Sequence, residues 1–248
     1  MKKQTFYANG DSFVYGMEIL GDQDDSPENK DLSFSKSMSR AMNSTHYINN
    51  AYCGATNEFI FRKTLRDLTL MLDQGQDPGE LFVLVGITSL YRIEVVGRGL
   101  KSYVGPEFNS LRAEYRDFGT LFFNPKNKMR IDVGRRSVAL DELIVPWATQ
   151  FLWDDDLLLE QQWARFTGLK SFLDLNHIDH LFVNTTQSVD KLEQTSSAFG
   201  TNSIYGLDQS FAQWGRVNYP DQVRQASHFG PAVHQVYGQV LMDHLASR

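Results

Sequence analysis

Short apolar runs alternate along this chain with longer stretches in which apolar and polar positions are mixed. The clearest run is 81–85, where five apolar residues follow one another, a pattern typical of a parallel strand that is covered on both faces. The segments 5–8, 47–50 and 180–184 predict three further strands. These segments are spread over most of the chain, so longer connections must lie between them.

Helical spacing of apolar residues appears between the predicted strands. A stripe with steps of three and four predicts a helix over 58–73, and Gly75 follows it as a natural stop. Similar spacing predicts helices over 32–42, 146–175 and 231–246. Strands that alternate with helices favour an α/β protein with a mainly parallel sheet and helices on both faces, a three-layer α/β/α sandwich.

Three segments lack a clear period. The segment 97–145 is rich in glycine and in aromatic residues, and this aromatic content is too high for disorder. We therefore predict one domain over residues 1–248, with 97–145 as an insertion or lid in the middle of the chain. The segment 21–33 is acidic and predicts an exposed loop beside the site, and 187–220 is polar and predicted to be rich in loops.

Composition narrows the class of protein. The 248 residues are 42% hydrophobic, which suits a single domain of enzyme size. The formal net charge of -6 argues against nucleic acid as the main partner. A single cysteine, Cys53, excludes an intramolecular disulfide and a cysteine-based zinc cluster, and the carboxylates in 21–33 do not have the spacing of a calcium loop. We expect neither a metal nor a cofactor.

The N-terminal residues also bear on location. Two lysines near the start are not followed by an apolar segment of signal-peptide length, so no signal peptide is expected. No stretch approaches the roughly 20 apolar residues that span a bilayer, so no transmembrane segment or membrane partner is expected.

Candidate chemistry begins at Gly10-Asp11-Ser12, directly after the first predicted strand. This position puts Ser12 at the carboxyl end of a strand, where open α/β sheets bind their ligands. A serine hydroxyl needs a nearby base to act as a nucleophile, and His228, just before the last helix, is the candidate. His234 is the alternative base, although its place within the predicted helix favours a packing role.

Four blocks occur in a fixed order: Gly10-Asp11-Ser12, 49–57, 81–89 and 228–234. Together they resemble the SGNH hydrolase superfamily, the GDSL-type lipases and esterases, whose fold is flavodoxin-like. Divergent, phage-encoded members look most similar. The resemblance implies that Ser12 is the nucleophile and His228 the general base, and that the backbone amides of Ser12 and Gly54 form the oxyanion hole. A strand-to-helix turn capped by Thr56 or Asn57 is a second, compatible interpretation of the Gly54 segment.

The chain departs from the family pattern at two positions. The asparagine expected two residues after Gly86 is Thr88, so the hydroxyl of Thr88 or Ser89 is predicted to take over part of the oxyanion role. The aspartate expected three residues before the histidine is also absent. Asp221 or a backbone carbonyl would then orient His228, and we expect the carbonyl because Asp221 is seven residues away. The prediction is thus a Ser12-His228 dyad.

These observations predict a serine esterase that hydrolyses a carboxylic ester, such as an O-acyl group on a carbohydrate, and acts as a deacetylase. The expected partner is a small-molecule or carbohydrate ester. The alternative is a catalytically inactive SGNH-fold protein with a binding or structural role, for example in a phage particle. The expected location is cytoplasmic or virion-associated, and the oligomeric state is left open.

Overall fold

The computed structural model describes residues 3–22, 24–89, 92–96, 118–122, 130–132, 155–186, 204–225 and 227–248. Its centre is a five-stranded sheet in the order β2-β1-β3-β7-β8, with every neighbouring pair parallel. The strands are β1 (Thr5–Asn9), β2 (His46–Asn49), β3 (Leu81–Ile87), β7 (Asp179–Asn184) and β8 (Ile204–Tyr205). The predicted parallel sheet is therefore confirmed.

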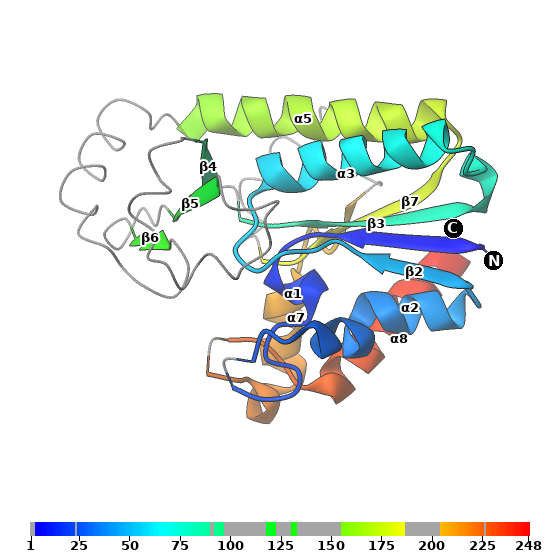
Figure 1. Cartoon of the computed structure of the whole chain (residues 1–248). Helices are drawn as coiled ribbons and strands as arrows, with labels where there is room; N and C mark the ends of the chain where they lie inside the picture. The colour runs from blue at the N-terminus through cyan, green and yellow to red at the C-terminus, as the bar shows by residue number, and fades with distance from the viewer. Residues whose placement is uncertain are drawn as a thin grey trace.

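Helices cover both faces of this sheet (Figure 1). On one face lie α3 (Asn57–Asp73) and α5 (Asp155–Leu175). The other face carries α1 (Ser12–Tyr15), α2 (Phe34–Ala41), α7 (Phe211–Asn218) and α8 (Pro231–Ala246). The arrangement is the predicted three-layer α/β/α sandwich.

Side chains of the central strands enter the two cores in turn. In β1, Phe6 and Ala8 belong to the core beside α2 and α8, whereas Tyr7 belongs to the core beside α3 and α5. All three are fully buried, and β3 and β7 alternate in the same way. A strand that is buried on both faces has no need of polar positions, which explains the unbroken apolar run in β3.

Two predicted loops contain more structure than expected. The segment 187–220, of which 187–203 lies outside the described residues, includes β8 and α7. Because β8 has only two residues, it leaves no periodic signal. The acidic loop 21–33 contains a 3-10 helix, Pro27–Leu32, and buries Asn29, whose side chain accepts from Leu20 N at 3.0 Å and donates to Asp24 O at 3.0 Å.

The middle of the chain contributes a second sheet. Three antiparallel strands, in the order β4-β5-β6, are formed by β4 (Arg92–Val96), β5 (Phe118–Phe122) and β6 (Arg130–Asp132). Of the predicted insertion 97–145, only β5 and β6 are among the described residues, so its role as a lid stays a prediction. The predicted start of α5 at 146–154 also lies outside them. Within the described ranges, no helix is both long and apolar enough to cross a membrane.

Two glycines let the turn after β1 pack against β3. A Cβ atom on Gly10 would lie 2.4 Å from Val14 Cγ2 and 3.2 Å from Gly86 Cα, and a Cβ on Gly86 would lie 2.4 Å from the same valine atom. Neither position has room for a side chain. The glycine of Gly10-Asp11-Ser12 is therefore required by packing, and this packing fixes α1 at the end of the sheet.

Candidate functional site

Ser12 lies where the connections of the sheet change sides. It is the first residue of α1, which follows β1, and Asp11 caps this helix by accepting from Phe13 N at 3.1 Å. The chain leaves β1 towards α2 on one face, whereas it reaches β3 through α3 on the other face. Ligands of open α/β sheets bind at the carboxyl ends of strands at such a switch point.

His228 contacts Ser12 directly. Its Nε2 atom lies 2.8 Å from Ser12 Oγ, and the two residues are only 7% and 4% exposed. The ring of Phe13 packs against the imidazole with centroids 4.6 Å apart, and His228 O accepts from Arg224 N at 2.7 Å. The structure thus brings together two residues that are 216 positions apart in the sequence.

A buried glutamate lies on the other side of the imidazole. Glu18 Oε2 is 3.3 Å from His228 Nδ1, and Glu18 is 0% exposed. Ser12, His228 and Glu18 therefore form a continuous line of contacts. Sequence analysis missed Glu18 because the family pattern directs attention to positions just before the histidine, whereas Glu18 is close to the serine in sequence.

The sequence predicts that Asp221 or a backbone carbonyl orients His228, and the carbonyl stays a prediction. Asp221 is exposed and lies in a 3-10 helix, Pro220–Gln222. Gln225, at the position of the family aspartate, is exposed and donates its backbone N–H to Asp22 Oδ1 at 3.4 Å. The carboxylate beside Nδ1 is that of Glu18.

Gly54 lies in the loop between β2 and α3. This loop is tied to the turn before Ser12, since Tyr52 N donates to Gly10 O at 3.0 Å. Gly54 has a φ of 80°, in the left-handed region that favours glycine, and a Cβ atom there would meet no described atom within 4 Å. Thr56 is the N-cap of α3 and accepts from Phe59 N at 3.1 Å, so the predicted capped turn is present.

Thr88 is fully buried just after β3. Its Oγ1 donates to Asp11 Oδ2 at 2.8 Å, and the side chain of Asn57 pairs with its backbone N and O at 2.9 and 3.0 Å. The Thr88 hydroxyl thus has Asp11 as its acceptor and also lies 3.3 Å from Thr186 Oγ1, and its oxyanion role stays a prediction. Ser89 is half-buried at the end of the described range and stays a predicted donor.

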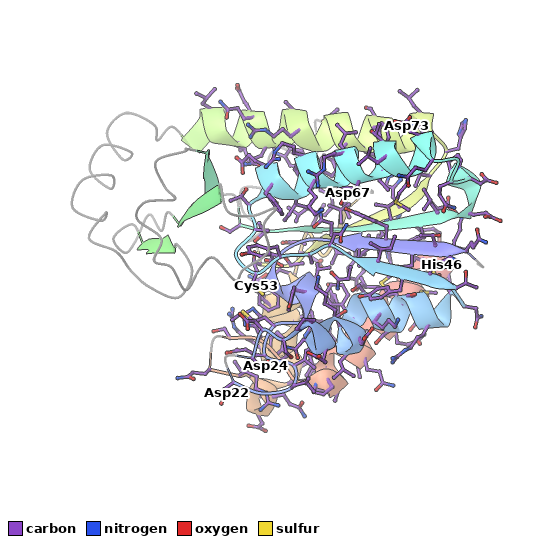
Figure 2. All side chains as sticks on the ribbon, in the orientation of Figure 1. Asp22, Asp24, His46, Cys53, Asp67 and Asp73 are labelled. Atoms are coloured by element: carbon purple, nitrogen blue, oxygen red, sulfur yellow. The ribbon has the colours of Figure 1, made fainter. Side chains whose placement is uncertain are left out.

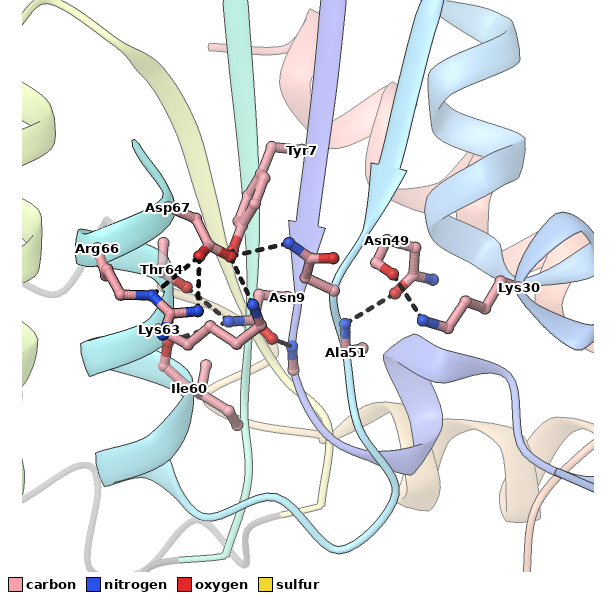
Figure 3. A network of polar contacts seen from close by, with 12 residues as sticks. Tyr7, Asn9, Lys30, Asn49, Ala51, Ile60, Lys63, Thr64, Arg66 and Asp67 are labelled. Atoms are coloured by element: carbon pink, nitrogen blue, oxygen red, sulfur yellow. Dashed lines mark hydrogen bonds and ion pairs between the residues drawn. The ribbon is translucent and has the colours of Figure 1, made fainter. Parts of the chain in front are cut away.

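Two asparagines brace the loops around Ser12 (Figure 3). Asn9, the last residue of β1, donates to Ile60 O at 3.1 Å and accepts from Gly10 N at 2.9 Å. Asn49 donates to Val14 O at 3.0 Å, which holds α1 from the side of β2. Both asparagines are nearly or fully buried, so their hydrogen bonds replace the lost contacts with water.

Asp67 on α3 is the centre of a second group of hydrogen bonds and ion pairs (Figure 3). Its Oδ2 accepts from Tyr7 Oη at 3.0 Å, Asn50 Nδ2 at 2.8 Å and Lys63 Nζ at 2.9 Å. Burial by itself raises the pKa of Asp67. The hydrogen bond and charge of Lys63, with the bonds from Tyr7 and Asn50, outweigh burial, so this pKa lies below its usual value. Asn50 of the 49–57 block and Tyr7 of β1 thus join the sheet region to α3.

Acidic residues of the loop after α1 make hydrogen bonds. Figure 2 shows Asp22 and Asp24 in this loop on the α1 side of the sheet. Asp24 accepts from Ser26 N and Ser26 Oγ at 3.0 and 3.1 Å, so its carboxylate closes a local turn. Among the described residues, no group of three or more histidines, cysteines or carboxylates could hold a metal ion.

His234 is buried in the core rather than placed beside Ser12. Its Nδ1 accepts from Phe34 N at 3.3 Å, and its ring stacks on that of Phe34 at 5.9 Å. Burial, and to a smaller degree the charge of His228, lowers the pKa of His234 to about 3. His234 therefore packs in its neutral form.

The lowered pKa of His234 makes stability depend on pH. The unfolded chain takes up a proton near the ordinary histidine pKa, whereas the folded chain does not, so stability is complete above about pH 6.5 and falls towards pH 3. As the pH falls from about 7 to about 5, His234 should lower the free energy of unfolding by about 2 kcal/mol. Urea unfolding should show that loss in the parent and not in His234→Gln, whose amide oxygen still accepts from Phe34. The exposed His46→Gln is the control, and equal losses in the parent and His234→Gln would contradict the prediction.

Comparison with family models and with curated proteins gives no match for this chain. Solved structures do show similarity. A psychrotrophic esterase from Pseudoalteromonas sp. is 12% identical, with 99% of this chain and 98% of that chain covered and a TM-score of 0.47. A putative lipolytic protein of the G-D-S-L family from Desulfitobacterium hafniense DCB-2 is 10% identical, with 96% and 97% covered and a TM-score of 0.44. An acetyl xylan esterase from the rumen bacterium Butyrivibrio proteoclasticus is 12% identical, with 100% and 64% covered and a TM-score of 0.46.

With identities of 10–12% and TM-scores below 0.5, these alignments do not assign an activity to this chain. Each of the three alignments covers 96% or more of this chain.

Proposed function

We propose that this protein is a serine esterase in which Ser12 is the nucleophile and His228 the general base. The observation that carries the proposal is the 2.8 Å contact between Ser12 Oγ and His228 Nε2 at the carboxyl end of β1. This distance is within hydrogen-bond reach, as a base requires in order to take the proton of a nucleophile. The near-complete burial of both residues strengthens their electrostatic interaction.

The proposed reaction has two steps. Ser12 Oγ attacks the carbonyl carbon of the ester while its proton passes to His228 Nε2, and the imidazolium then gives this proton to the leaving alcohol. A water molecule then gives a proton to the same imidazole and attacks the acyl carbon, and the acid leaves as the imidazolium returns this proton to Ser12 Oγ. All bonds that form or break belong to Ser12, His228, water and the ester, so the reaction needs no cofactor.

The proposed oxyanion donors are the backbone amides of Ser12 and Gly54. Ser12 is the first residue of α1, and amides in the first turn of a helix have no carbonyl partner within that helix. The Gly54 loop is tied to Gly10, two residues before Ser12. Because the Thr88 hydroxyl donates to Asp11, we do not include it, and a missing donor typically lowers the rate about 100- to 1,000-fold. We therefore expect slow turnover.

The proposed substrate class is a carboxylic ester, with an O-acyl carbohydrate as the natural case and deacetylation as the reaction. The carbohydrate part of this proposal rests on the sequence resemblance. All esters of this class react at the same carbonyl carbon, so a simple ester reports the proposed activity whatever the natural alcohol is. A short acyl group is therefore the first choice of test substrate.

A fluorophosphonate that reacts with activated serines tests the proposed function. It should label Ser12 in the folded protein, and peptide mass spectrometry should find the added mass on the peptide that contains Gly10-Asp11-Ser12. Protein unfolded in urea should not be labelled, because the contact with His228 is then lost. A folded protein that is not labelled at Ser12 and does not hydrolyse aryl acetates would instead be the inactive binding or structural protein of the alternative.

A further inference from the structure

The carboxylate of Glu18 is buried beside the base of the proposed reaction. Glu18 is 0% exposed, and its Oε2 lies 3.3 Å from His228 Nδ1. A buried carboxylate is costly unless it is hydrogen-bonded, and the imidazole can supply an N–H donor. The contact also selects one tautomer. A proton on Nδ1 donates to Glu18, which leaves Nε2 as the acceptor for the Ser12 hydroxyl.

We infer that Glu18 is the positioning residue of this site, whose carboxylate holds the His228 imidazole with Nε2 towards Ser12. This inference rests on the proposed esterase function. As Ser12 Oγ bonds to the carbonyl carbon, its proton moves to Nε2, and the Nδ1 proton stays in its hydrogen bond to Glu18. Glu18 takes no proton and stabilises the positive charge that forms on the imidazole.

The local backbone supports a functional reason for Glu18. The chain reverses after α1 at Gly16, which has a φ of 89°, and Glu18 itself has a φ of 64°. Glycine or asparagine suits this left-handed conformation better than glutamate, so a glutamate at this position carries a conformational cost. Ser227, just before His228, also has a positive φ, of 72°. Non-glycine residues with a positive φ thus occur at Glu18 itself and directly before His228.

The loop that carries Glu18 is held firmly. Glu18 N donates to Asp24 O at 2.7 Å, and Asp24 O also accepts from the buried side chain of Asn29. The same loop meets the segment before His228 where Asp22 accepts from Gln225 N. The acid of this site therefore comes from the segment after the serine. In the family that the sequence resembles, it comes from the position of Gln225.

Replacement of Glu18 by glutamine tests this role, because glutamine has nearly the same shape but no charge. We expect kcat for an aryl acetate to fall about a hundredfold with little change in KM. This is less than the 10,000-fold known for a fully engaged triad acid, because 3.3 Å is longer than a strong charge-assisted bond of about 2.8 Å. Glu28→Gln, an exposed change of the same kind in the same connection between α1 and α2, and Asp221→Asn should both leave kcat unchanged.

The pH profile separates positioning from a merely structural effect. Without the carboxylate, the imidazolium is less favoured, so the pH of half-maximal kcat/KM should fall by about one unit in Glu18→Gln. The nearby His234 is neutral over this pH range and is present in every variant, so it does not account for a difference between them. Equal kcat values and equal pH profiles in Glu18→Gln and Glu28→Gln would overturn the inference.

Histidine NMR tests the contact without activity. In the parent, the neutral His228 ring should carry its proton on Nδ1, and its titration midpoint should lie higher than in Glu18→Gln. His228→Gln identifies the signal by its loss. A proton on Nε2 in the parent would overturn the inference even if Glu18→Gln did not fold. If the parent hydrolyses no ester, the proposed function is wrong, and the tautomer still decides whether Glu18 holds the ring.

Discussion

Replacement of Ser12 by alanine should reduce ester hydrolysis at least about a thousandfold, down to the background rate, because the residue that forms the acyl-enzyme is lost. Stopped or continuous assays with an aryl acetate measure this directly. The change removes one hydroxyl from a buried site and leaves His228 Nε2 without its contact to Ser12, which costs about 1 kcal/mol. The thermal midpoint should therefore change by only a few degrees, roughly 2 to 4 °C.

The matched control is Ser39→Ala. Ser39 is a buried serine on α2, 2% exposed, so the substitution removes the same hydroxyl from another part of the fold. It should leave the rate unchanged. Equal rates in Ser12→Ala and the parent would show that hydrolysis does not pass through Ser12, and the esterase proposal would then be wrong.

Replacement of His228 by glutamine should have an effect close to that of Ser12→Ala. The glutamine amide can donate a hydrogen bond to Glu18 but cannot accept and return a proton at neutral pH, so we expect a loss of at least about a thousandfold in kcat. The double variant Ser12→Ala/His228→Gln should be no slower than either single variant. Ser12 and His228 act together in one step, so removing either residue already removes the contribution of both.

The control for this prediction is His180→Gln. His180 lies at the start of β7, at the end of the sheet opposite to Ser12, where its Nδ1 contacts Ile178 O at 2.9 Å. Its replacement should not change kcat. Rates that multiply in the double variant, so that it is far slower than both single variants, would indicate that Ser12 and His228 act independently and would contradict the proposed roles.

Local patterns were sufficient for most of the fold. The apolar run 81–85 predicted β3, and the helical spacing of 58–73 predicted α3 to within one residue of its start. Such signals are strong because burial on both faces of a sheet, or on one face of a helix, repeats along many residues. The pattern was silent on β8, because two residues are too few to repeat.

Some features of the candidate site were also predictable from the sequence, and others depend on the tertiary structure. The position of Ser12 after a strand and of His228 before the last helix is a local property, and the sequence by itself determined both candidates. Their contact, and that of Glu18 with His228, join segments about 210 residues apart, which only the tertiary structure decided. No local rule connects a carboxylate after one helix with an imidazole before another. Their meeting depends on how the loops at the carboxyl ends of the strands pack, and hydrogen bonds such as those of Asp24 and Asn29 fix that packing.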